Sequence, residues 1–116
     1  MSIDSIVKQK SMTFAKRIVS LYKYLGAEHH EYVMSKQILR SGTSIGANIA
    51  EAVYGSSRKD FAAKLQIARK EASEPLYCLE LLYSCSYIPE DLYQSLYADC
   101  REILAILPAT IKSCED

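Results

Sequence analysis

The sequence predicts an all-α fold, an antiparallel up-and-down four-helix bundle in which residues 1–116 form one domain. Apolar residues recur every three or four positions in four successive stretches, and this spacing is helical. Only four glycines and three prolines interrupt the chain, and no stretch has the features of a strand. With 116 residues, 49% of them hydrophobic, the chain buries enough surface to fold without a disulfide or a structural metal.

The first predicted helix covers residues 3–25, and Lys16 and Lys23 point away from its apolar line. That line consists of Ile3, Val7, Phe14, Ile18, Leu21 and Leu25. Gly26 comes directly after it, at the position where a glycine commonly ends a helix. Residues 27–31 are then expected to form a polar link.

The second predicted helix contains an unusual run of small residues. Its apolar line is Met34, Ile38, Ile45, Ile49 and Ala52. Glycine inside a helix costs about 1 kcal/mol, so Gly42 and Gly46 need a packing reason. Together with Ala50 they form a stripe at four-residue steps, which predicts the close approach of another helix. Gly55 is expected to end this helix.

The third predicted helix runs from about Arg58 to Ser84. Ser57 is the expected N-cap, and Asp60 three residues later comes close to a capping box. The apolar line that defines this helix is Phe61, Leu65, Ala68, Ala72, Leu76, Leu79 and Tyr83.

Pro75 lies inside the third helix and leaves two alternatives open. A proline there removes one backbone hydrogen bond and crowds the carbonyl of Glu71. Either the helix kinks, or it stops and restarts with Ser73 as its N-cap. The apolar line continues through the proline, which favours the kink.

The fourth predicted helix begins at Pro89, because proline suits a first helical turn, and Pro108 should bend it near its end. Its main apolar line is Leu92, Leu96, Ile103, Leu107 and Ile111. A second row widens the face: Tyr93, Tyr97, Cys100 and Leu104. The chain has nine tyrosines, and a face wider than one core needs suggests a subunit contact.

Charge is unevenly distributed along a chain whose formal net charge is zero. Residues 1–25 hold five basic and one acidic residue, and residues 87–116 hold two basic and six acidic residues. Net charges of +4 and −4 therefore predict that the first and last helices are complementary neighbours.

The four cysteines, Cys78, Cys85, Cys100 and Cys114, show no metal-binding spacing. On one helix Cys78 and Cys85 would lie about 10.5 Å apart, too far for a disulfide. All four cysteines are interpreted as small core residues of a cytoplasmic protein. No apolar stretch is long enough to span a membrane, and the N-terminus lacks a signal peptide.

No motif predicts an enzyme, a cofactor or a metal site. Adjacent histidines point about 100° apart on a helix, so residues 28–31 (Glu-His-His-Glu) are interpreted as solvated link. Residues 42–46 lack the lysine of a phosphate-binding loop. No nucleophile lies beside a plausible base. The acids Glu51, Glu71 and Glu74 are expected to form interhelical ion pairs with Arg40, Lys64 and Arg69.

Basic side chains on outward faces of the first three helices form a candidate nucleic-acid surface. The candidates are Lys8, Lys16, Arg17, Lys23, Arg40, Lys64, Arg69 and Lys70.

Two stretches, RSGTSIGANIAEA from residue 40 and SSRKDFAAKLQIARKEASEPLYCLELL from residue 56, carry a family resemblance. They resemble the proteins encoded in intervening sequences of bacterial large-subunit (23S) ribosomal RNA genes. The resemblance implies a four-helix bundle, and relatives tend to form homopentamers. The accessory proteins of diversity-generating retroelements, which bind a reverse transcriptase and nucleic acid, are a more distant relation. The matching positions are Arg40, Ser41, Gly42, Gly46, Asn48, Glu51, Asp60, Phe61 and Glu71.

The sequence therefore predicts a non-enzymatic, oligomeric binding or scaffold protein, with a homopentamer favoured by the resemblance. The alternative is an RNA-binding accessory factor, tied to ribosomal RNA intervening sequences or a reverse transcriptase, that acts through basic surface on the first and third helices. An RNA or protein partner is expected, and no cofactor.

Overall fold

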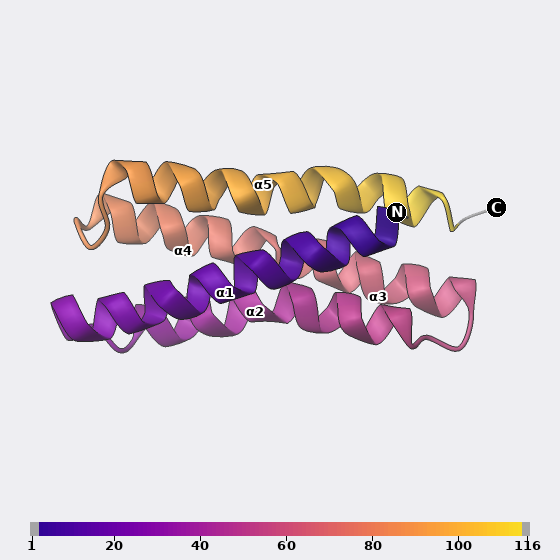
Figure 1. The fold of residues 1–116 in the computed structure, drawn as a ribbon, viewed down its shortest axis with the longest axis horizontal. Helices are drawn as coiled ribbons and strands as arrows, with labels where there is room; N and C mark the ends of the chain where they lie inside the picture. The colour runs from indigo at the N-terminus through magenta and orange to yellow at the C-terminus, as the bar shows by residue number, and fades with distance from the viewer. Residues whose placement is uncertain (1–2, 115–116) are drawn as a thin grey trace.

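Four antiparallel rods make up the computed structural model, which describes residues 3–114 (Figure 1). The helices are α1 (Ile3–His29), α2 (Met34–Val53), α3 (Arg58–Glu71), α4 (Ser73–Ser84) and α5 (Glu90–Lys112). α3 and α4 follow one another along the third rod. No strand occurs in the described range, and the predicted all-α four-helix bundle is confirmed.

The rods are arranged as the corners of a square. α1 packs against α2 and α5, and the rod formed by α3 and α4 packs against the same two helices. Within residues 3–114, α1 touches neither α3 nor α4, so these lie at diagonal corners. The elongated body measures 48 × 22 × 21 Å, and both ends of the described chain lie at one end of it (Figure 1).

The core runs along the centre of the bundle and takes side chains from every rod. Its largest fully buried members are Phe14, Ile18, Leu25, Ile38, Ile45, Ile49, Leu65, Leu79, Leu82, Leu96, Ile103 and Leu107. Each such side chain stabilises the fold by about 1.5–3 kcal/mol relative to exposure. Most of the predicted apolar lines are buried, although Tyr83 is 36% exposed and the side chain of Ile3 lies outside the described residues.

Close approach of α1 to α2 explains one of the two glycines of α2, Gly42. A Cβ at Gly42 would lie 2.9 Å from Cγ1 of Ile18, and one at Gly46 would lie 3.5 Å from Oγ and 3.7 Å from the backbone oxygen of Ser11. The prediction that the small-residue stripe accommodates a closely approaching helix is confirmed at Gly42, whereas a Cβ at Gly46 would make only ordinary contacts.

The predicted end of α1 at Gly26 is wrong. α1 continues to His29, and the chain turns at His30, whose φ is 50°. Ser86 likewise turns the chain after α4, with a φ of 67°, whereas none of the four glycines has a positive φ. At His30 and after α4 the chain reverses through residues that adopt the left-handed conformation at a cost of about 1–2 kcal/mol, so glycine positions did not reveal these helix ends.

The third rod is interrupted at Ala72. Ala72 keeps helical angles (φ −67°, ψ −15°), so the path continues from α3 into α4. The rod does restart at Ser73, but Ser73 is not the N-cap, because its hydroxyl donates instead to the carbonyl of Lys70. Pro75 has no N–H to offer Glu71, and the ladder of backbone bonds breaks just before it. The structure therefore follows the alternative of a stop and restart rather than the favoured continuous kinked helix, with Ala72 in place of Ser73 at the N-cap position.

Other predicted helix ends agree with the structure. α2 ends at Val53, two residues before Gly55, and the Ser57 hydroxyl accepts from the backbone N–H of Asp60 at 3.0 Å. α5 follows Pro89 directly and continues past Pro108 to Lys112.

The cysteines divide into two kinds. Cys78 and Cys100 are buried, as predicted, and the Cys100 thiol donates to the Ala72 carbonyl at 3.4 Å. Cys85 is exposed and Cys114 is half-buried, so the prediction of a core position is wrong for both. Each lies beyond the last residue of a helix, where the buried face has already ended.

Candidate interaction surfaces

Opposite charges line the contact between α1 and α5. Arg17 donates to Asp99 at 2.6 Å and to Ser95 at 3.0 Å, and Lys10 pairs with Glu102. The predicted complementarity of the first and last helices is therefore confirmed, with Glu115 and Asp116 lying outside the described residues. A groove beside these pairs is lined by Lys10, Asp99 and Glu102, each of which already forms an ion pair within the chain.

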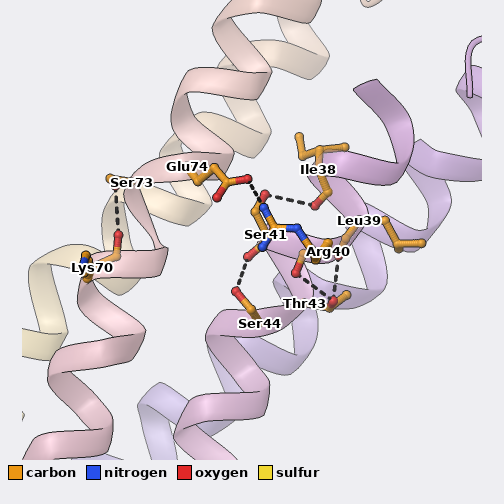
Figure 2. A network of polar contacts seen from close by, with 9 residues as sticks. All are labelled: Ile38, Leu39, Arg40, Ser41, Thr43, Ser44, Lys70, Ser73 and Glu74. Carbon is orange, nitrogen blue, oxygen red and sulfur yellow. Dashed lines mark hydrogen bonds and ion pairs between the residues drawn. The ribbon is translucent and has the colours of Figure 1, made fainter. Parts of the chain in front are cut away.

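A second polar seam joins α2 to α4 next to the break at Ala72. Figure 2 shows Arg40 reaching from α2 to the carboxylate of Glu74 on α4. Beside it, hydroxyls on α2 donate to carbonyls one turn earlier: Ser44 to Ser41 at 2.8 Å, and Thr43 to Leu39 at 2.6 Å. These local bonds let α2 carry polar side chains at a helix interface without leaving them unpaired.

Most of the remaining signature positions also have structural contacts. Glu51 pairs with Lys64 of α3 at 3.5 Å, and the Asn48 amide donates to the Ser44 carbonyl at 2.9 Å. Phe61 packs against the core. Of the three predicted acids, Glu51 and Glu74 form the expected ion pairs, whereas Glu71 makes none with a described residue.

The structure does not bring the candidate nucleic-acid residues together on one surface. Arg17, Arg40 and Lys64 are each paired with a carboxylate. Within residues 3–114, Lys16 and Lys23 of α1 form no ion pair, and the same holds for Arg69 and Lys70 of α3; Lys8 is exposed on α1. Because α1 and α3 occupy diagonal corners, the candidates form two separate groups.

Glu31 has a role that sequence reasoning missed. Its carboxylate accepts from the backbone N–H groups of Val33 and Met34 at 3.1 Å and of Ser35 at 2.8 Å, and so caps α2. Burial opposes the charge, but the three N–H donors outweigh it and lower the pKa of Glu31 below its ordinary value. The available signal was an acid just before a helix start, where the helix dipole favours it.

Aromatic side chains gather between α4 and α5. The rings of Tyr83 and Tyr93 stack with centroids 4.7 Å apart, and Tyr97 lies 5.4 Å from Tyr93. Burial, and then the nearby Glu80 carboxylate, raise the pKa of Tyr93. Elsewhere Tyr54 is 86% and Tyr77 62% exposed, which leaves large apolar area on the outside of the bundle.

Neither histidine belongs to a metal-binding group among the residues described. His29 lies against the rings of Tyr24 and Tyr87, and His30 forms the turn after α1. No group of three metal-binding side chains occurs between residues 3 and 114. In the same range, no helix combines the length and the apolar character that crossing a membrane requires.

Fold and surfaces together define a small helical-bundle protein with charged seams between its rods. Residues 3–109 match the family described as "23S rRNA-intervening sequence protein", and the chain belongs to that family. It is also similar to a crystal structure described as a protein with unknown function from the S23 ribosomal protein family, from Bacteroides thetaiotaomicron VPI-5482. That protein is 56% identical, the match covers 96% of this chain and 99% of that chain, and the TM-score is 0.92. None of the curated proteins matches the chain.

Proposed function

We propose that this protein is a non-enzymatic binding or scaffold protein that works as a homo-oligomer, with a pentamer favoured. The observation that carries the proposal is the amount of large apolar side chain outside the bundle, including Tyr54, Tyr77 and Met12, each more than half exposed. Tyrosine and methionine are enriched in subunit interfaces, and exposed apolar patches commonly mark them. The preference for five subunits comes from the family resemblance.

Mass measurement tests the oligomer directly. Native mass spectrometry and sedimentation velocity of the full chain at micromolar concentration should give a species of five times the 13.1 kDa chain mass. Another multiple of the chain mass would keep the oligomer and reject the pentamer. A single chain mass at every concentration would overturn the proposal.

RNA binding is the second candidate, favoured by Lys16 and Lys23, which point outward from α1 without an ion pair to any described residue. The accessory role at a ribosomal RNA intervening sequence or a reverse transcriptase remains part of this candidate. Fluorescence anisotropy with a labelled RNA should show affinity that falls with the logarithm of salt concentration, as phosphate contacts require. Absence of binding at low salt would rule this candidate out.

We further expect the protein to act in a reducing compartment such as the cytoplasm. All four cysteines are free thiols, which is typical of cytoplasmic proteins.

A further inference from the structure

The outward face of α1 carries a stripe in which apolar and basic residues alternate. Met12, Lys16, Val19 and Lys23 are spaced by four, three and four residues, so they share one face of the helix. We call them the α1 stripe. The two apolar members are 56% and 37% exposed, and neither lysine pairs with a described residue. The core side chains of α1, such as Ile18, lie on a different face, so the stripe is free for contact.

A second unpartnered face lies where α4 meets α5. It consists of the stacked rings of Tyr83 and Tyr93, the adjoining ring of Tyr97, and the Glu80 carboxylate, and we call it the tyrosine face. No other part of residues 3–114 hydrogen-bonds the three tyrosine hydroxyls, and Glu80 forms no ion pair in that range. The face therefore offers aromatic rings, free hydroxyls and one negative charge.

The positions of the two faces in the bundle suit a contact between copies. α1 and α4 lie at diagonal corners and do not touch, so the faces cannot meet within one chain. They also lie at similar heights along the bundle. Arg17 reaches Asp99, and one groove joins Tyr24 to Leu92, which places Lys16, Val19 and Lys23 level with the first half of α5 and Met12 just beyond its middle. Two copies side by side with parallel axes would bring one face against the other.

The chemistry of the faces is complementary. Lysine ammonium groups bind the faces of tyrosine rings and attract the Glu80 carboxylate, and methionine packs well against aromatic rings. A phosphate backbone would satisfy Lys16 and Lys23 but would leave the tyrosine face uncovered. The complementarity therefore favours a second copy of this chain over a nucleic acid.

We propose that the α1 stripe of one copy docks on the tyrosine face of the next, in a head-to-tail contact. Such contacts use two different surfaces per subunit and generate rings when the rotation closes. The inference rests on the proposed homo-oligomer and names the surfaces that hold it together. In it, Lys16 and Lys23 flank Glu80 of the neighbouring copy, and Val19 covers its tyrosine rings with Met12 at the rim of the contact.

Charge reversal tests the contact. The variants are Lys16→Glu with Lys23→Glu, Glu80→Lys alone, and all three together. The control is Lys59→Glu, an exposed lysine of α3 outside both faces. In a sedimentation velocity series, the first two variants should raise the concentration needed for assembly about tenfold or more, because like charges would meet. The control should match the parent, and the triple variant should recover most of the assembly. Circular dichroism checks that each variant stays helical.

The possible results separate the docking surfaces from the oligomer itself. A parent that assembles while the face variants assemble equally well overturns the docking surfaces and leaves the oligomer standing. Variants that keep the parent mass but lose RNA binding assign the α1 stripe to RNA and also overturn the docking. A parent that is a monomer at every concentration overturns the proposed oligomer, and the docking with it.

Discussion

Replacing Gly42 by alanine should destabilise the fold, whereas the same change at Gly46 should stabilise it. Alanine gains about 1 kcal/mol over glycine inside a helix at either position. At Gly46 the added methyl would meet Ser11 at 3.5 Å or more, which is an ordinary contact. At Gly42 it would lie 2.9 Å and 3.0 Å from the two γ carbons of Ile18, and overpacking of this kind costs about 1–3 kcal/mol.

The net expectation is a loss of up to about 2 kcal/mol for Gly42→Ala and a gain of up to about 1 kcal/mol for Gly46→Ala. Urea unfolding followed by circular dichroism, at one fixed protein concentration, measures both. The double-mutant cycle with Ile18→Ala isolates the cause, since without the γ carbons the nearest atom to the Gly42 methyl is Cβ at 3.3 Å. In that background Gly42→Ala should cost little or stabilise. Equal stability of the two alanine variants in the parent background would refute the reasoning.

Three further outcomes follow from single residues. Ser86→Gly should stabilise by about 1 kcal/mol, because φ is 67° there and glycine adopts that conformation without strain; an unchanged thermal midpoint would contradict this. Glu31→Gln should destabilise by about 1 kcal/mol at neutral pH. Because the pKa of Glu31 is lowered below 4.5 in the folded state, its contribution is present above that pH and lost as the pH falls through the folded pKa, so urea titrations of parent and variant should converge in acid. A thiol reagent should modify the exposed Cys85 in the native protein but Cys100 only after unfolding, since burial raises the pKa of Cys100 to about 12; mass mapping of the labelled peptides tests this, and fast native labelling of Cys100 would contradict it.

The four rods and most of the core could be predicted because apolar periodicity is a property of the sequence alone. Net charge predicted the α1–α5 seam for a similar reason, since complementary helices tend to be neighbours. The helix ends were harder to predict. His30, and not Gly26, turns the chain after α1, Ser86 turns it after α4 without a glycine, and Glu31 caps α2 from outside the usual cap position. The position of a helix end depends on alternative local hydrogen bonds whose free energies differ by only about 1–2 kcal/mol.

The surfaces could be predicted only in part. Which cations remain free depends on the side chains that each one meets in the folded bundle, although the predicted up-and-down topology did imply that α1 and α3 lie at diagonal corners. Arg40 belonged both to the nucleic-acid candidates and to the expected ion-pair partners, and its pair with Glu74 confirms the second expectation. The second apolar row of the last helix did indicate a wide aromatic face, and Tyr93 and Tyr97 indeed belong to the tyrosine face.

The break at Ala72 has a consequence for the order in which the chain folds. α3 has 14 residues and α4 has 12, and isolated helices of this length are marginal in water. α1 and α2, with 27 and 20 residues, are longer and adjacent in sequence, so their hairpin can form early through local contacts. We expect substitutions in α3 and α4 to accelerate unfolding and leave the refolding rate nearly unchanged. Stopped-flow kinetics that show slowed refolding instead would place the broken rod in the folding nucleus.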